Sequence, residues 1–460
     1  MTVSFLAHQK ITAVRFFVYF VTFHKFTHEL WQAILQQIGR KQGVFGSTDW
    51  LGSYKTASDR LQEVWLSDLF RLENEVLNRL AQNKTFGIFS AGISLDWQGS
   101  YQSQIGFGGW LTTLLPTTFG LSGDLARFAI YSVPAAISAW IVTVIARALE
   151  SNFSIRNWMV FAFLLTQPWL IAFGTWPLVF GFRLLPALFL VHVLSRGEKG
   201  WWLVCVAPAL LMIPGFGSGY EFATVVIGMS LAAITYFAVK EQWRVFSTVR
   251  MTVMSFFSFV LGLGMTLGLH VLQLRLRHGS FSKGLEILTF QLSKRSGAGE
   301  RSLDDPLLIE SAGASLRLVT DWYLAVPLVF SPARIPILGE LTIGMLLATC
   351  VMMTIYLLRS GVTESRSRQS LALGMATIVS VIGPLGWITL FRPWVYIHTH
   401  WTGVIWMFPT LPLATLFLAS MLRSRASSQP VVREEAALSM SVFAVAGIAA
   451  CVVVALVMAQ

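Results

Sequence analysis

Long apolar runs leave this chain few options other than a bundle of membrane-spanning helices. Taking about 20 apolar residues as one helical crossing, the sequence predicts about eleven spans. They fall near 11–24, 128–146, 157–173, 175–194, 201–214, 221–239, 251–273, 336–358, 370–391, 402–421 and 436–458. Of the 460 residues, 55% are hydrophobic and only 12% are charged, which is not the composition of a soluble globule. We therefore expect an all-α polytopic transmembrane helical bundle in which residues 1–460 form a single integral-membrane domain.

The basic residues predict how this bundle is oriented. Arginine and lysine concentrate in the short loops near 147–156, 195–200, 240–250, 359–368 and 422–435. The short loops of the opposite face carry almost only Arg392. By the positive-inside rule the N-terminus is inside and the C-terminus is outside. The net charge of +11 therefore fits topology control better than nucleic-acid binding.

This orientation places two long polar segments outside, at residues 25–127 and 274–335. In the first outer loop, apolar residues recur at steps of three and four between residues 59 and 82, which predicts an amphipathic helix lying in the interface. The Gly- and Pro-rich stretch 105–121 is too short for a crossing, and we interpret it as re-entrant or interfacial. No cleavable signal peptide precedes the first span, because Arg15 interrupts the run and no small-residue cleavage site follows.

The polar run Ser94–Gly109 leads from the first outer loop toward the membrane. Asp96, Tyr101 and Gln104 stand in this run among amides, hydroxyls and glycines. An outer carboxylate beside such groups is suited to bind a sugar and to act as a general base. The alternative is that Asp96 only caps a glycine-rich helix.

A second outer carboxylate, Glu221, follows Tyr220 at the start of a predicted span. A carboxylate at the boundary of water and lipid is costly unless it has a partner or a function. The alternative is that Glu221 only favours a helix N-terminus through the helix dipole.

The segment 391–401 joins two apolar runs and contains Arg392, His398 and His400. In an extended segment both imidazoles point to one side, whereas in a helix they lie about 200° apart and cannot share a metal ion. Contact with a phosphate or a sugar needs only hydrogen bonds. The alternative is an aromatic belt, since Trp394, Tyr396 and Trp401 are typical of membrane edges.

Arg183 lies inside an apolar run, about 10 Å below its predicted outer end by helical rise. Charged residues within the membrane favour a functional interpretation, and the phosphate of a lipid entering from the bilayer is a natural counter-ion. The alternative is a structural ion pair with a carboxylate on another helix.

Together these features resemble the GT-C superfamily of glycosyltransferases that use polyprenyl-phosphate sugars. The layout is similar, with one span, a long outer loop with an interfacial helix, and then many spans. The local motifs Tyr101-Gln102-Ser103-Gln104-Ile105-Gly106, Gly219-Tyr220-Glu221-Phe222 and Tyr396-Ile397-His398-Thr399-His400 look like those of bacterial GT-C-like proteins that build surface polysaccharides. The resemblance implies a multi-pass protein of the bacterial inner membrane.

The resemblance also implies roles for individual residues. A carboxylate of the first outer loop would be the catalytic base; the loop has no acidic pair, and of Asp49, Asp68 and Asp96 we favour Asp96. Glu221 and His398 would share the catalysis, while Tyr101, Gln104, Arg183, Tyr220, Arg392 and His400 would bind substrate. A divalent metal ion, Mg²⁺ or Mn²⁺, is optional because cationic side chains neutralise phosphate equally well.

The expected partners are a polyprenyl-phosphate sugar, a glycan or lipid-linked acceptor and membrane lipids, with no nucleic acid. Two other functions stay open. An O-antigen ligase or polymerase also acts outside on lipid-linked glycans, but its large outer loop typically comes late in the chain. A secondary transporter or flippase would place polar residues near mid-membrane and often shows two related halves.

Overall fold

A computed structural model of the chain describes residues 2–23, 118–121, 123–153, 158–161, 180–217, 220, 222–296, 343–360, 365–390, 405–406 and 409–427. Every regular element in these ranges is a helix, so the predicted all-α class is confirmed for them. The predicted interfacial helix at 59–82, nearly all of the stretch 105–121, the hairpin 391–401 and the last predicted span 436–458 lie outside the described residues.

Four described helices are long and apolar enough to cross a bilayer: Ser132–Glu150, Ala223–Lys240, Val245–Leu276 and Ser367–Trp387. They overlap the predicted spans at 128–146, 221–239, 251–273 and 370–391. Shorter apolar helices overlap five more predicted spans: Thr12–Thr22, Gly181–Ser195, Trp202–Gly217, Ile343–Arg359 and Thr410–Met421. The chain is thus a helical membrane protein, while the count of about eleven spans and their orientation remain predictions.

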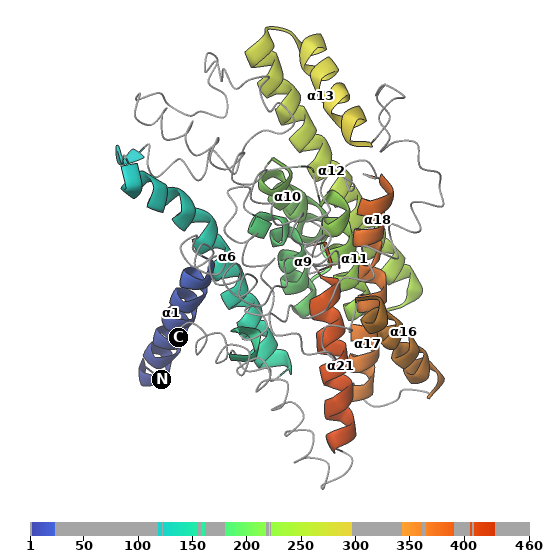
Figure 1. Ribbon diagram of the computed structural model, residues 1–460. Helices are drawn as coiled ribbons and strands as arrows, with labels where there is room; N and C mark the ends of the chain where they lie inside the picture. Colours follow the sequence, from blue (N-terminus) through green and yellow to red (C-terminus); the bar gives the residue numbers. More distant parts are fainter. Residues whose placement is uncertain are drawn as a thin grey trace, which may run out of the picture.

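Figure 1 shows three groups of helices. The central group consists of α9 (Leu185–Ser195), α10 (Ala207–Gly217), α11 (Ala223–Lys240) and α12 (Val245–His278). On one side α11 packs against α17 (Ser365–Ser380) and α18 (Ile382–Leu390). The helices α16 (Ile343–Arg359) and α21 (Thr410–Ser427) pack in turn against α17. On the other side α1 (Thr2–Phe23) pairs with α6 (Gly123–Phe153).

Helix α12 is longer than the predicted span. Its 34 residues extend to His278, and they rise about 51 Å, more than the roughly 30 Å of hydrocarbon in a bilayer. Gly279, with φ +81°, ends the helix, and α13 (Phe281–Ser296) folds back against it. The first part of the predicted outer loop 274–335 is therefore a helical hairpin, visible at the top of Figure 1.

A proline separates α17 from α18. Pro384 has no N–H to donate to the carbonyl of Ser380, and the chain turns at Val381 before Leu385 N resumes the helix with a bond of 3.0 Å to the Val381 carbonyl. The sequence predicts an interruption of this span at Pro384. Both α17 and α18 pack against α11.

The backbones of helices α11 and α18 lie in direct contact. A Cβ atom on Gly228 of α11 would lie 2.8 Å from the backbone nitrogen of Gly383 in α18, and one on Gly383 would lie 3.0 Å from Val225 Cα. Such distances leave no room for a side chain, so only glycine fits at the crossing. Small residues at helix crossings are how membrane helices gain packing, because lipid supplies no hydrophobic drive between them.

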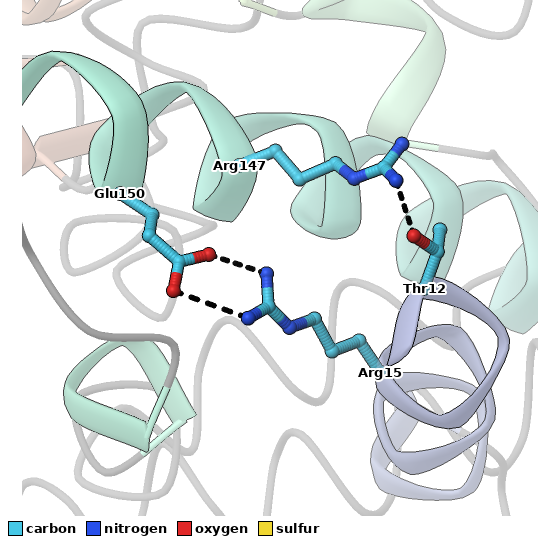
Figure 2. A network of polar contacts seen from close by, with 4 residues as sticks. All are labelled: Thr12, Arg15, Arg147 and Glu150. Atoms are coloured by element: carbon cyan, nitrogen blue, oxygen red, sulfur yellow. Dashed lines mark hydrogen bonds and ion pairs between the residues drawn. The ribbon is translucent and has the colours of Figure 1, made fainter. Parts of the chain in front are cut away.

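An ion pair holds α1 against α6 (Figure 2). Arg15 donates to both carboxylate oxygens of Glu150, at 2.5 and 3.2 Å, and Arg147 donates to the hydroxyl of Thr12. Arg15, which interrupts the first apolar run, thus has its counter-charge on the neighbouring helix. The start of the apolar part of α1 therefore lies beside the end of α6.

We expect Gly228→Ala to lower the free energy of unfolding by about 1–3 kcal/mol, because the added methyl group meets the backbone of α18. Thermal unfolding in detergent micelles measures the change. Gly264→Ala in α12 is the matched control, since nothing lies within 4 Å of its Cβ position. Equal stability of the two variants would contradict the close approach.

The Arg15–Glu150 pair is suited to a double-mutant cycle with Arg15→Gln and Glu150→Gln. We expect a coupling energy of about 1 kcal/mol, since the Arg15 side chain is largely shielded from water. The same cycle on Lys283 and Glu286, both largely exposed, should give a smaller coupling. Equal couplings would mean that the α1–α6 pair contributes no more than a surface contact.

Candidate functional site

Arg183 is buried where the chain enters α9. A 3-10 turn, Phe180–Arg183, precedes the helix, and the Leu184 amide donates to the Gly181 carbonyl at 3.0 Å. The Arg183 side chain is 3% exposed, and Gly215 of α10 faces it so closely that a Cβ there would lie 3.4 Å from Arg183 Cγ. The sequence predicts Arg183 within the span 175–194, and the structure places it at the end of the 3-10 turn that opens the apolar helical stretch Gly181–Ser195.

The guanidinium of Arg183 lies over an aromatic stack. Its central carbon is 5.0 Å from the ring centre of Phe222, and Phe222 stacks on Trp387 of α18 with ring centres 5.4 Å apart and an interplanar angle of 12°. A cation over an aromatic face is stabilised by the ring quadrupole, and more so when water is excluded. The stack therefore provides a polarisable wall beside a buried positive charge.

Phe222 has an unusual backbone. It is the residue before α11, and its φ of +69° lies in the left-handed region. A bulky residue rarely adopts this conformation, which costs about 1–3 kcal/mol and persists only where packing enforces it. Here the packing that holds Phe222 is its stack with Trp387.

A tyrosine and a histidine meet beside this stack. The Tyr220 hydroxyl is 3.0 Å from Nδ1 of His270, which lies in α12, and the two rings stack with centres 5.8 Å apart. Both side chains are buried, His270 completely. The pair connects the entry of α11 to α12.

These side chains belong to one end of the helix bundle. Tyr220, Phe222 and Trp387 share a single hydrophobic cluster with Ile405 and Trp406, both fully buried. We call Arg183, Tyr220, Phe222, His270 and Trp387 the cation–aromatic cluster. Two of its members, Tyr220 and Phe222, flank Glu221 in the sequence, and the hairpin 391–401 connects Trp387 to Ile405.

Of the predicted site residues, Arg183 and Tyr220 are described, and both belong to the cation–aromatic cluster. The others lie outside the described residues: Asp96, Tyr101, Gln104, Glu221, Arg392, His398 and His400. Among the residues that are described, no group of three or more His, Cys, Asp or Glu is placed to hold a metal ion. The Mg²⁺ or Mn²⁺ expectation is untested by this observation.

Sequence reasoning missed His270, Phe222 and Trp387. His270 had a usable signal, because an ionisable side chain within an apolar run is a candidate functional residue. Phe222 stands in the Gly219-Tyr220-Glu221-Phe222 motif but was not singled out as a site residue. Trp387 had no signal, because aromatic residues are common in every span and its contact with Phe222 joins segments far apart in the sequence.

The cluster combines groups that suit an anionic, partly apolar ligand. Arginine binds phosphate oxygens through several N–H donors, and aromatic faces pack against sugar rings or hydrocarbon. Two more polar groups near it, Thr224 Oγ1 and Trp406 Nε1, are buried without a hydrogen-bond partner in the described part of the chain. Buried donors of this kind usually have a partner, so they indicate where a ligand would be held.

We expect Tyr220→Phe to lower the free energy of unfolding by about 1–3 kcal/mol, because it leaves buried His270 without the tyrosine hydroxyl. Thermal unfolding in micelles again measures the effect. Tyr356→Phe serves as the control, since Tyr356 is largely exposed on α16. Equal midpoints for both variants would show that the Tyr220–His270 contact contributes nothing to stability.

Comparisons of the chain with protein-family profiles, with curated proteins and with solved structures find no match. The functional argument therefore depends on the cation–aromatic cluster and on the sequence segments that enter and leave it.

Proposed function

We propose that the chain is a membrane glycosyltransferase of GT-C type. It transfers a sugar from a polyprenyl-phosphate donor to a lipid-linked or surface glycan acceptor on the outer face of the membrane. The observation that carries the proposal is the buried guanidinium of Arg183 over Phe222, at the end of the bundle from which the Glu221 and histidine segments depart.

A buried arginine in a membrane protein requires a reason. Placing a cation among apolar side chains costs several kcal/mol unless an anion or polar groups compensate. Arg15 pairs with the carboxylate of Glu150, and the guanidinium of Arg183 lies over the ring of Phe222. The phosphate of a long-chain lipid reaches such a position sideways through the bilayer, and its isoprenoid tail stays in hydrocarbon.

The proposed reaction uses the residues that the sequence singles out. The acceptor hydroxyl oxygen attacks the anomeric carbon and forms the new glycosidic bond, while a carboxylate, Asp96 or Glu221, takes the hydroxyl proton. The bond from the anomeric carbon to the phosphate oxygen breaks, and its electron pair leaves with the polyprenyl phosphate. Arg183 or Arg392 neutralises that phosphate, and His398 or His400 donates a hydrogen bond to it. The anomeric configuration inverts.

The position of the cation–aromatic cluster favours an enzyme over a transporter. Substrate sites of secondary transporters lie near the bilayer midplane, often at broken helices. The cluster instead gathers where α9 and α11 begin and near the end of α18. An O-antigen ligase or polymerase would share this position and is separated from a transferase only by its donor and product.

The test uses purified full-length protein with radiolabelled polyprenyl-phosphate sugars and membrane glycan acceptors. We expect transfer to one acceptor class, a loss of about 100-fold or more for Glu221→Gln or His398→Gln, and weakened donor binding for Arg183→Gln. Glu198→Gln, His192→Gln and Arg275→Gln are matched controls, because these three side chains are exposed outside the cluster.

Two results would overturn the proposal. One is full transfer activity in Asp96→Asn, Glu221→Gln and His398→Gln alike, with unchanged unfolding midpoints. The other is movement of the intact lipid-linked sugar across proteoliposomes without any glycosidic bond being formed, which would identify a flippase.

A further inference from the structure

The far end of α11 lies at a membrane boundary. Two helices of membrane-crossing length meet there, because α11 ends at Lys240 and α12 begins at Val245. The connection of residues 241–244 must therefore lie near the level of the lipid headgroups. Residues 196–202, which join α9 to the π-helical turn Trp202–Val206, lie beside it, since Lys199 Nζ is 4.1 Å from the ring centre of Trp243. We call residues 196–202 and 240–250 the boundary face.

The boundary face is basic. Arg196, Lys199, Lys240, Arg244 and Arg250 are all exposed, and Glu198 and Glu241 are its carboxylates. Lys240 Nζ lies 5.5 Å from the ring centre of Tyr236 and 5.8 Å from that of Phe237. The Glu241 carboxylate accepts a hydrogen bond of 2.8 Å from Trp243 Nε1, which fixes the ring beneath Lys199. The aromatic rings thus hold two ammonium groups in place, and each ammonium keeps donors for a further partner.

The same face exposes large apolar side chains. Trp201 and Trp202 are 59% and 58% exposed and pack edge to face, and Phe246 is 79% exposed at the start of α12. Tryptophan beside lysine and arginine is typical of the headgroup region of a bilayer. A nucleic acid or a soluble acidic protein would satisfy the charges but would leave Phe246 and Trp202 in water.

We propose that the boundary face binds the phosphate-bearing headgroup of an anionic phospholipid, with Lys199 and Lys240 donating to the phosphate and Trp201, Trp202 and Phe246 packing on the acyl chains. The other basic residues of the boundary face also favour an anionic lipid, because they add positive charge around the proposed phosphate position. This proposal is independent of the glycosyltransferase, since it concerns the opposite end of α11.

The experiment is native mass spectrometry of the full chain in detergent, titrated separately with phosphatidylglycerol, with phosphatidylcholine and with water-soluble glycerol phosphate. We expect phosphatidylglycerol to be retained preferentially. Lys199→Gln combined with Lys240→Gln should weaken its retention about tenfold, while phosphatidylcholine retention stays unchanged. Unfolding midpoints of the variants, measured without lipid, show that the fold is intact.

The control is Arg275→Gln combined with Lys283→Gln at the other end of α12. It removes the same charge and also takes a cation away from an aromatic ring, because Arg275 lies 4.2 Å from the ring centre of Phe281. Equal retention of the two lipids, or equal losses in both double variants, would overturn the proposal. So would displacement of phosphatidylglycerol by equimolar glycerol phosphate, because the site would then bind free phosphate and not a lipid.

Discussion

Close packing of α11 against α17 and α18 forms the central contact of the described bundle. It brings two backbones together at Gly228 and Gly383, where a Cβ atom on Gly228 would lie 2.8 Å from the opposing nitrogen. Lipid tails pack against apolar side chains as well as another helix does. A pair of membrane helices is therefore stabilised by the close approach of their backbones, which lipid tails cannot replace. Trp387, on α18, is thereby carried to Phe222, at the entry of α11.

The bundle accommodates its cations in three different ways. Arg15 pairs with the carboxylate of Glu150, which is the electrostatic solution available to a helix pair. Lys199 and Lys240 are exposed near helix ends, each with its ammonium group over an aromatic ring, that of Trp243 for Lys199 and that of Tyr236 for Lys240. Arg183 is buried over Phe222 and Trp387, at the position where a left-handed residue is held by packing. The first two arrangements keep the cation beside a carboxylate or at a helix end, whereas Arg183 is enclosed within the bundle beside the left-handed backbone of Phe222.

Much of the helical organisation could be predicted from hydropathy, because a bilayer forces each crossing to be a long apolar helix. The interruption at Pro384 was also predictable, since proline removes a specific backbone donor. The contacts between Tyr220 and His270 and between Phe222 and Trp387 were not, because they join segments distant in the sequence and their residue types are common in membrane helices. Arg183 was identified from its charge within a predicted span, but its partner ring was not, because Phe222 lies in another segment of the chain. The extension of α12 to His278 was missed because Arg275 and Arg277 reduce the hydropathy there without ending the helix.

The cation–aromatic cluster also constrains where the remaining predicted residues can act. Glu221 is bonded on both sides to residues of the cluster, so its Cα atom is within about 4 Å of theirs along the chain. In the sequence, the segment 391–401 lies between α18, which contains Trp387, and Ile405. Trp387 and Ile405 pack in the same hydrophobic cluster as Tyr220 and Phe222. The left-handed φ of Phe222 turns the backbone immediately before α11. In the proposed glycosyl transfer Arg183 and Glu221 act on different molecules, because the phosphate belongs to the sugar donor whereas the proton that the base takes comes from the acceptor hydroxyl.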